Sequence, residues 1–327
     1  MGYQKSLSMF KEMNLDTMRY PGFLEKAIQI EKEGIENVEN KNGWYHVDKC
    51  PLCNSMKRKT EFVKLGIAIV CCLECSLRYA GRFPVNTEDV YSDGKYQEAV
   101  VNIYMKNHAF KMENFGKERI ELIRQHIDKP NESKLLDIGC GTGWFLELSK
   151  KYGFDVSGQE LSKHMAQWTS ERLNISIMNL PIDKLSTSIK YDVITMFDVL
   201  EHVKDPMKII LKCRSLLNYN GIIVIFTLNF DSLSVHIMKE YSNIIAPPAH
   251  LTFFNKRSVQ LLSEKSGLEL IYYRTCGIDI GDLKAFYEWK KENEMALACK
   301  KLYDIIQPVV DEAEAGNHIR LILKKRN

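Results

Sequence analysis

Short apolar runs alternate with amphipathic stretches between residues 134 and 228, and this alternation predicts strands that are each followed by a helix. Between the runs, apolar residues recur with helical spacing, as in Trp144, Phe145 and Leu148. The runs with the length of buried strands are 134–138, 154–158, 175–178, 191–196 and 222–228. Strands that alternate with helices predict an α/β fold with a parallel sheet, helices on both faces, and a ligand site outside the carboxyl ends of the strands.

The patterning before and after this region predicts additional elements. Residues 1–45 include apolar positions with helical spacing and an acidic run, which predict a solvated helical extension that caps the next domain or covers part of the active site. After a long segment at 229–255 we expect a helix at 258–265 and strands at 268–274 and 318–323. Residues 279–316 look like a helical insertion. Its expected core positions are Leu302, Ile305, Ile306 and Val309, before Pro308 disturbs the pattern.

A glycine-rich loop follows the first strand of the core. It reads Asp-x-Gly-x-Gly-x-Gly from Asp137 to Gly143, and a dinucleotide site would instead need its third glycine at Trp144. Glycines allow positive φ and let a ligand approach the backbone closely. The spacing suits a ligand with an amino-acid tail, because Asp137 can accept from an ammonium and bare loop amides can bind a carboxylate. Glu160, after the second strand, is well placed to accept from both hydroxyls of a ribose.

An amino-acid tail joined to a nucleoside describes S-adenosylmethionine. We expect its adenine beside the end of the third strand, and Phe197 at the end of the fourth. The candidate cofactor-binding residues are Asp137, Gly139, Cys140, Gly141, Gly143, Glu160, Leu161, Asn179, Leu180 and Phe197.

Two Cys-x2-Cys pairs precede the core, Cys50 with Cys53 and Cys72 with Cys75, separated by 18 residues. This spacing is typical of a zinc ribbon in which four thiolates close a tetrahedron around one ion, and a closed site is structural. The apolar stretch 61–71 between the pairs predicts a hairpin, and Cys71 is a buried spare thiol. Four reduced core cysteines are the alternative, which the paired spacing disfavours.

Composition indicates which classes of binding partner and which cellular compartment to expect. The 45 Lys and Arg residues against 42 Asp and Glu residues give a formal charge of +3, which does not indicate a nucleic-acid or membrane partner. No apolar run reaches the length of a membrane span, and the N-terminus lacks the apolar region of a signal peptide. Nine cysteines without an obvious disulfide framework fit a reducing compartment, so we expect a cytoplasmic protein.

With these motifs the chain resembles the class I S-adenosylmethionine-dependent methyltransferases, within the branch of ubiquinone-biosynthesis, sugar and natural-product methyltransferases. Three stretches carry the resemblance: 136–143, 198–203 (Asp-Val-Leu-Glu-His-Val) and 248–254 (Pro-Ala-His-Leu-Thr-Phe-Phe). It implies a seven-stranded sheet whose last strand is antiparallel and inserted between strands five and six. The domains expected are a helical extension at 1–45, a zinc ribbon at 46–90 and the methyltransferase domain at 91–327.

The expected activity is methyl transfer to a hydroxyl or amine of a small molecule, such as a sugar, a nucleotide-sugar or a natural product. Ala249 stands where related sugar C-methyltransferases carry Glu, which favours O- or N-methylation. Two alternatives remain at this point. One is a nucleic-acid or protein methyltransferase that docks through the ribbon, and the other is a non-catalytic zinc-ribbon binding protein.

A general base is needed only where the acceptor is a hydroxyl with a high pKa. The candidate catalytic residues are His250 and His202, with Tyr91 as a further base. His202 has a structural alternative, as a capping or packing residue. In ubiquinone-type relatives a Glu-x-x-Glu-His pattern holds a divalent ion. Asp198, Glu201 and His202 resemble that pattern, which suggests a second metal site there.

Overall fold

The structure is a computed structural model that describes residues 15–90, 108 and 110–326. The contacts within the chain divide it into two compact units. The first comprises residues 1–91, 227–259 and 273–320, and the second comprises residues 92–226, 260–272 and 321–327. The domain boundaries expected from the sequence are linear and differ from this grouping. The cysteine-rich region, residues 50–80, belongs to the same unit as two segments from the second half of the chain.

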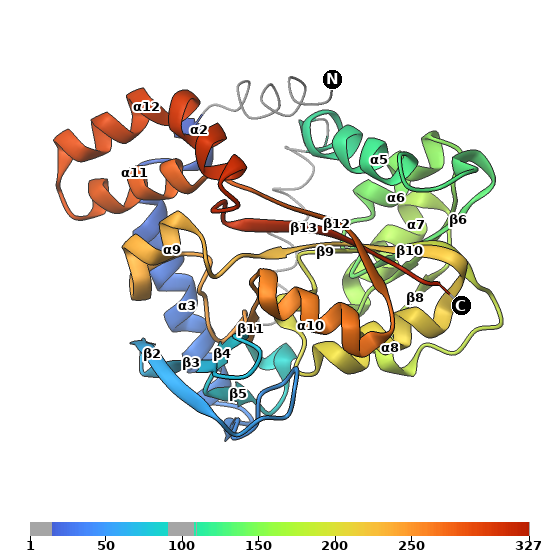
Figure 1. The fold of residues 1–327 in the computed structure, drawn as a ribbon, viewed down its shortest axis with the longest axis horizontal. Coiled ribbons are helices and arrows are strands. Elements are labelled where there is room, and N and C mark those ends of the chain that lie inside the picture. Colours follow the sequence, from blue (N-terminus) through green and yellow to red (C-terminus); the bar gives the residue numbers. More distant parts are fainter. Residues whose placement is uncertain (1–14, 91–107, 109, 327) are drawn as a thin grey trace. The chain divides into compact units, whose positions relative to one another are not determined.

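The second unit is built on a seven-stranded sheet (Figure 1). Its order is β12 (Glu269–Cys276), β13 (His318–Lys324), β10 (Leu217–Leu228), β9 (Tyr191–Phe197), β6 (Lys134–Ile138), β7 (Asp155–Gln159) and β8 (Ile177–Met178). Strands β10, β9, β6, β7 and β8 are parallel. The start of β10 meets the end of β13, since Asn220 N donates to Lys325 O. Strand β13 is therefore antiparallel to β10 and is inserted between β10 and β12, as the family resemblance predicted.

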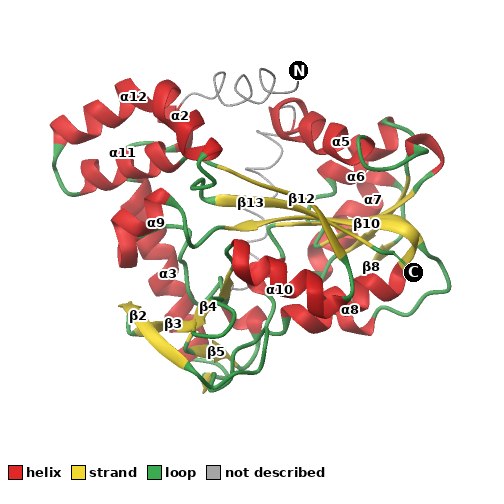
Figure 2. Cartoon of the chain, in the orientation of Figure 1, coloured by secondary structure: helices red, strands yellow, loops and turns green. Residues whose placement is uncertain are grey.

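Helices cover both faces of this sheet, with α5, α6 and α7 on one face and α8 on the other (Figure 2). Ser162 accepts from Met165 N and caps α7 (Lys163–Leu173), and Asp205 caps α8 (Pro206–Leu216), where the proline needs no hydrogen bond. Between the sheet and the helices α5 and α6 lies a core of buried side chains, which come from α5, α6, β6, β9 and β10. The other described helical elements of this unit are η2 (Met112–Gly116), α5 (Lys117–Arg124), η3 (Pro130–Glu132), α6 (Trp144–Lys151), η4 (Ile182–Lys184) and η5 (Leu200–His202). Helix α10 (Lys256–Ser266) begins in the first unit and ends in the second.

The fifth strand starts earlier than its apolar run. An Asn-Gly pair favours a turn, yet Asn220 and Gly221 lie inside β10 as an irregularity between Leu217, which pairs with Tyr191, and Ile222, which pairs with Val193. Asn220 adopts a φ of 61°, which asparagine tolerates better than most residues. The Asn-Gly pair therefore marks a bulge inside β10 and not the beginning of the strand.

The first unit contains two small sheets. Strands β2 (Arg58–Lys64) and β3 (Ile67–Cys72) form the hairpin predicted between the cysteine pairs, and β4 (Arg78–Ala80) and β11 (Thr252–Phe253) extend it in the order β11-β4-β3-β2. Strands β1 (Trp44–His46) and β5 (Arg82–Pro84) form the second sheet. The helical elements are α2 (Leu15–Met18), α3 (Phe23–Glu39), η1 (Thr87–Val90), α9 (Leu233–Met238), η6 (Lys239–Tyr241), α11 (Asp279–Trp289) and α12 (Asn293–Glu312). No helix within the described residues is both long and apolar enough to span a membrane.

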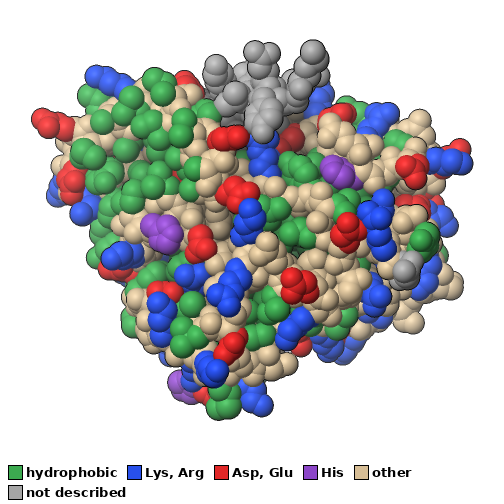
Figure 3. All heavy atoms as spheres, viewed as in Figure 1, with side chains coloured by type: hydrophobic (Ala, Val, Ile, Leu, Met, Phe, Trp, Pro, Cys, Tyr) green, Lys and Arg blue, Asp and Glu red, His purple; other side chains and the backbone are tan. Residues whose placement is uncertain are grey.

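Three of the four expected core positions on α12 were wrong, whereas Ile306 packs against the core of this unit as expected. Leu302, Ile305 and Val309 are 41%, 65% and 64% exposed, and apolar side chains gather on the surface over this helix (Figure 3). The buried face instead carries Tyr303, Gln307, Val310 and Asp311, and the helix continues through Pro308.

Two polar residues on the buried face of α12, Gln307 and Asp311, are hydrogen-bonded, which explains why the apolar pattern did not identify this face. Gln307 Nε2 donates to Asp311 Oδ1 at 2.9 Å, and its Oε1 accepts from Ile280 N at 3.0 Å. Because hydrogen-bonded polar residues occupy part of this buried face, the buried positions of α12 do not appear as an apolar pattern in the sequence.

Candidate functional site

The glycine loop joins β6 to α6 in the second unit, and each of its three glycines has a positive φ. The reason for glycine differs between them. A Cβ on Gly139 would lie 2.6 Å from Val199 Cγ2, and one on Gly143 would lie 2.4 Å from Thr169 Cγ2, so the packing of the protein excludes side chains there. A Cβ on Gly141 would meet nothing closer than 4.0 Å. The space above Gly141 is therefore open, as a cradle for a ligand requires.

Four of the loop amides are already hydrogen-bonded within the protein, which corrects the expectation that these amides are bare. Gly139 N donates to Gln159 Oε1 at 3.2 Å, and Gly141 N donates to Glu160 Oε2 at 2.9 Å. Cys140 N donates to Gln159 O at 3.0 Å, and Gly143 N donates to Cys140 O at 2.8 Å. A bound carboxylate would need another donor, because these N–H groups have protein acceptors.

Arg119 on α5 is the cationic side chain that the sequence reasoning missed. Its guanidinium lies 4.1 Å from the ring centroid of Phe197 and 5.0 Å from that of Trp144. Its positive charge lowers the pKa of Asp137, so it lies close to the acid that ends β6. Arg119 belongs to no sequence motif. The signal that could have identified it is its position, as a basic residue on the helix that precedes the first strand and the glycine loop.

Asp137 is a buried acid. It is 4% exposed, and Thr195 Oγ1 donates to its Oδ1 at 2.6 Å. Burial raises the pKa of Asp137 to about 7 despite the hydrogen bond from Thr195 and the charge of Arg119, and Glu160 adds to the rise. A carboxyl group in this position accepts a cation readily, because the cation replaces solvation that the carboxylate has lost.

Glu160 follows β7 and holds the glycine loop by a hydrogen bond from the loop backbone. Its Oε1 accepts from Ser162 N at 2.8 Å while Oε2 accepts from Gly141 N. Burial raises the pKa of Glu160, and these backbone donors oppose the rise. A carboxylate has about four acceptor positions, so two remain for hydroxyl groups.

The other predicted cofactor residues lie at the same strand ends. Asn179 Nδ2 donates to the backbone oxygens of Glu160 and Leu161, and Gln159 Nε2 donates to Leu180 O. Leu161 is 42% exposed. Phe197 ends β9 and makes edge contacts with Phe145 and Phe226, with ring centroids 4.9 and 4.8 Å apart. The residues predicted from separate motifs therefore come from the carboxyl ends of four neighbouring parallel strands.

The segment after β9 carries the suggested second metal site. Asp198 has a φ of 58°, and Glu201 is 1% exposed. The donor atoms of Glu201 and His202 lie within 4.8 Å of each other, whereas Asp198 does not belong to the groups of metal-ligating side chains found among the described residues. His202 N donates to Val199 O at 3.0 Å, which places this histidine at the end of a single 3₁₀ turn.

His250 belongs to the first unit, in the segment between α9 and β11. Its Nδ1 lies 2.8 Å from Ile244 O, and because a carbonyl oxygen only accepts, Nδ1 carries the proton. In the neutral imidazole the basic nitrogen is therefore Nε2. Tyr91, the third candidate base, lies outside the described residues.

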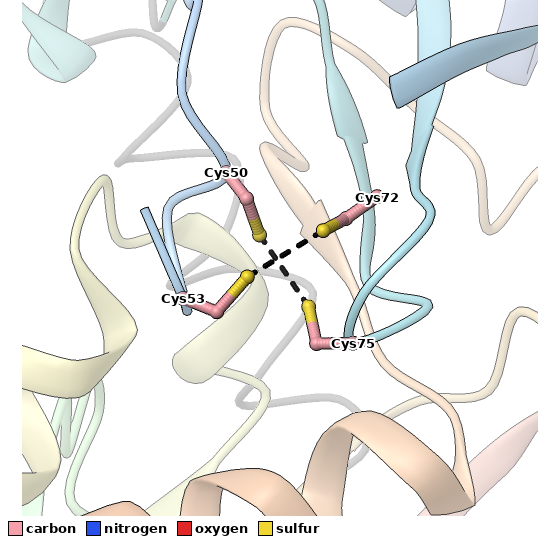
Figure 4. Close-up of side chains that lie close together, drawn as sticks. All are labelled: Cys50, Cys53, Cys72 and Cys75. Carbon is pink, nitrogen blue, oxygen red and sulfur yellow. Dashed lines mark hydrogen bonds between the residues drawn. The ribbon is translucent and has the colours of Figure 1, made fainter. Parts of the chain in front are cut away.

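The four cysteines of the first unit converge on one point (Figure 4). The Sγ atoms of Cys50 and Cys75, and those of Cys53 and Cys72, lie 3.5 Å apart, and all four fall within 4.8 Å of one another. Four sulfurs at about 2.3 Å from a tetrahedral zinc would be about 3.8 Å apart. The geometry therefore fits one tetrahedral ion.

The two cysteine turns have the same backbone structure. Asn54 N donates to Cys50 O and Ser76 N donates to Cys72 O, each at 2.9 Å, and both donors adopt positive φ. The pKa of Cys50 is lowered to about 5, first by a hydrogen bond from the Cys75 thiol and further by the backbone N–H groups of Cys53 and Leu52. Cys71, the expected spare thiol, is buried, and burial raises its pKa.

Comparison with known proteins agrees with this geometry. A family model described as a methyltransferase domain matches residues 111–273. Together with the fold and the Asp-x-Gly-x-Gly-x-Gly loop, this match identifies residues 111–273 as part of a methyltransferase domain of the class I S-adenosylmethionine-dependent type.

Individual relatives point the same way. A ubiquinone biosynthesis O-methyltransferase from Histophilus somni is 32% identical over 149 residues, which cover 41% of this chain and 62% of that protein. One from Nitrosococcus oceani is 29% identical over 201 residues, covering 56% of this chain and 83% of that protein. The chain thus matches less than two thirds of the Histophilus protein. Phosphoethanolamine N-methyltransferase 2 from Haemonchus contortus, solved with S-adenosyl-L-methionine, shares the fold with a TM-score of 0.53 and 16% identity, covering 76% of this chain and 62% of that one.

Proposed function

We propose that this protein transfers the methyl group of S-adenosylmethionine to a hydroxyl group of a small molecule. The observation that carries the proposal is the open space above Gly141, which is flanked by the buried Asp137 and by Glu160. The relatives that match most of this chain's core are named as O-methyltransferases, which supports a hydroxyl acceptor over an amine. A sugar, a nucleotide-sugar or a natural product is the proposed acceptor class, and a precursor in ubiquinone biosynthesis is the competing class that the relatives' name suggests.

Each end of the cofactor has a proposed partner. Asp137 accepts from the ammonium, and Arg119 binds the carboxylate that the occupied loop amides do not bind. Glu160 accepts from the ribose hydroxyls, and the adenine lies beside Leu161, Asn179 and Leu180. Phe197 closes the methionine side, where its ring is already held by Arg119 and Phe145. The amides of Gly139, Cys140 and Gly143 keep the loop in shape and do not bind the ligand directly.

The reaction asks the protein for geometry and for one proton acceptor. In-line attack by the acceptor oxygen on the methyl carbon forms the carbon–oxygen bond while the carbon–sulfur bond breaks, which leaves a neutral thioether. The hydroxyl proton goes to a base, and we assign it to Nε2 of His250, whose tautomer is set by the hydrogen bond of Nδ1 to Ile244 O. His202 is the second candidate.

One zinc ion completes the proposal for the first unit. Cys50, Cys53, Cys72 and Cys75 would hold it in a closed tetrahedral site, which has no position for a substrate and therefore supplies folding free energy. A further divalent ion at Glu201 and His202 remains a prediction, with two adjacent donors in its support.

Docking of a nucleic acid through the cysteine-rich region is the weaker hypothesis. The three cations of its basic stretch 57–59 are already paired: Lys57 with Glu74 at 2.9 Å, Arg58 with Asp48 at 3.0 Å, and Lys59 with Glu61 at 3.7 Å. A surface whose positive charges are compensated offers little to a phosphate backbone.

The test is transfer of a label from the cofactor. The protein is incubated with S-adenosylmethionine that carries a trideuterated methyl group and with fractionated small-molecule extracts, and products are sought by mass spectrometry. We expect a labelled O-methyl ether that is absent with a Gly141→Val variant. Labelling of RNA or protein but of no small molecule would contradict the acceptor class, and an absence of cofactor binding in calorimetry would contradict the activity.

A further inference from the structure

The strand that follows His250 is part of the sheet of the cysteine-rich region. Strand β11 pairs antiparallel with β4, Thr252 opposite Tyr79 and Phe253 opposite Arg78. Ala80 N also donates to Leu251 O at 2.9 Å, one residue beyond His250. The backbone immediately after His250 is therefore held by main-chain hydrogen bonds to the strand that begins three residues after Cys75.

Arg78 on β4 makes the strongest side-chain link between the two segments. Its Nη1 lies 3.1 Å from Asp231 Oδ1 and donates to Ser76 O at 3.0 Å, and its Nε lies 3.4 Å from Glu61 Oε1. The guanidinium also lies 4.7 Å from the ring centroid of Phe230. One planar cation thus joins the hairpin, the second cysteine turn and the segment after β10, and its side chain is only 15% exposed.

Polar contacts of the second cysteine turn also connect the cysteine-rich region to the segment after β10. Ser76 Oγ donates to Asn255 Oδ1 at 3.1 Å, and Asn255 Nδ2 donates to Asp231 Oδ2 at 2.8 Å. Arg257 Nη2 donates to Glu74 O, which lies between Cys72 and Cys75, at 2.7 Å. The turn that carries two of the four thiols is therefore bonded directly to Asn255 and Arg257, and Asn255 in turn joins it to Asp231.

Apolar packing and a buried ion pair complete the contact. Ile69 of β3 shares a buried core with Phe230, Ile244, Ile245 and Phe253, and the Phe62 ring stacks on Phe230 with centroids 6.1 Å apart. Lys64 of β2, which is 3% exposed, donates to Ser242 O at 2.7 Å and to Glu31 at 3.0 Å. The carbonyl that orients His250 belongs to Ile244, which lies inside this shared core.

From these contacts we propose that the cysteine-rich region, residues 50–80, is an internal scaffold that positions the segment 229–255, and that Arg78 is its principal positioning residue. The proposal goes beyond a zinc site that merely stabilises its own module, since filling the site also orders the backbone around His250. Its catalytic consequence rests on the proposed role of His250 as the base, whereas its structural content does not.

The first test removes the metal from the full-length, zinc-loaded protein with a chelator and follows amide hydrogen exchange. We expect exchange to rise at least tenfold in peptides covering 229–232 and 244–255 together with the cysteine turns. Peptides covering β6 and α6 serve as the internal reference and should change little. Unchanged protection at 244–255 while the cysteine turns open would overturn the proposal.

The second test uses variants that keep the metal. Arg78→Met removes the links to Asp231, Glu61 and Ser76, and Arg82→Met is the matched control, because Arg82 stacks on Trp44 at 4.4 Å in the other small sheet of the same unit. We expect Arg78→Met to shift the His250 ring resonances, assigned with a His250→Gln variant, and to raise exchange at 244–255 while zinc content is retained. Arg78→Lys should restore part of both signals. Equal effects of Arg78→Met and Arg82→Met would make Arg78 an ordinary stabilising residue and overturn its role.

The outcomes also separate this proposal from the proposed function. If the Arg78→Met protein loosens at 244–255 but His250→Ala still transfers the label at the normal rate, the scaffold stands and the base assignment falls. If His250→Ala is inactive and Arg78→Met changes neither exchange, nor resonances, nor the rate of label transfer, the base assignment stands and the scaffold is rejected.

Discussion

Thr195 Oγ1 donates a 2.6 Å hydrogen bond to Oδ1 of Asp137, and the two residues are directly opposite each other on the parallel strands β9 and β6. Both side chains are buried, so the hydroxyl fixes the orientation of the acid at the base of the glycine loop. Burial nevertheless raises the pKa of Asp137 to about 7, which leaves the carboxyl poised between its two protonation states at neutral pH.

Cofactor affinity should therefore depend on pH. Asp137 must be ionised to accept an ammonium, so lowering the pH below about 7 makes the ligand compete with a proton. Calorimetry with S-adenosylhomocysteine should show a roughly tenfold loss of affinity from pH 8 to pH 6, and an Asp137→Asn variant should bind weakly with no such slope. A parent protein whose affinity is the same at both values would contradict the role of Asp137.

The same raised pKa makes a prediction for the protein without cofactor. Between pH 4 and 7 the folded state holds the Asp137 proton that the unfolded chain has released, so this group lowers the free energy of unfolding as the pH rises. The Asp137→Asn variant should lose this contribution, which denaturant unfolding across that range can measure.

Gly141→Val should abolish cofactor binding with only a modest loss of stability. A Cβ at this position would meet only Gly139 O, at 4.0 Å, so we expect the valine side chain to project into the space assigned to the ligand. Because φ at Gly141 is +52°, the substitution also strains the backbone by about 1–2 kcal/mol. Gly43→Val is the control, since Gly43 has a φ of +71° and open space around its Cβ position. Equal affinities of the two variants for S-adenosylhomocysteine would refute the placement of the ligand.

Arg119→Gln should weaken the binding of S-adenosylhomocysteine about tenfold or more, because it removes the cation assigned to the carboxylate. It should leave the affinity for 5′-methylthioadenosine nearly unchanged, since that compound lacks the amino-acid group. A similar loss for both compounds would instead mean that Arg119 supports the site through its contacts with Phe197 and Trp144.

Protein purified without chelator should contain about one zinc per chain. Cys50→Ser should lose most of it and should lower the midpoint of thermal unfolding, because four-thiolate sites contribute directly to folding. Cys71→Ser is the matched control: it changes a buried thiol on the same hairpin and should retain the metal. Elemental analysis that finds no zinc in the parent protein would exclude this site.

His250→Ala should lower kcat by roughly 10²–10⁴ once an acceptor is in hand, with the affinity for S-adenosylhomocysteine nearly unchanged. A histidine that only shapes its loop through Ile244 O would instead lower stability and weaken acceptor binding. Near-normal kcat in His250→Ala would transfer the base assignment to His202, and His202→Ala is the variant to compare.

Local patterns in the sequence were sufficient for the parts of this protein that depend on neighbours along the chain. The glycine loop and the paired cysteine turns each follow from backbone demands that a few adjacent residues meet. The alternation of strands and helices also predicted the sheet, since parallel strands and their crossover helices leave periodic apolar runs.

Tertiary structure alone decided what depends on distant partners. The buried face of α12 is polar because Gln307 and Asp311 satisfy each other and Ile280 N, and such satisfaction leaves no hydrophobic period. The charge of Arg119 acts on Asp137 although the two residues come from different elements, and Arg78 contacts Asp231 while β11 pairs with β4, although these segments are far apart in the chain. These relationships arise from packing between segments, so no pattern within one segment records them.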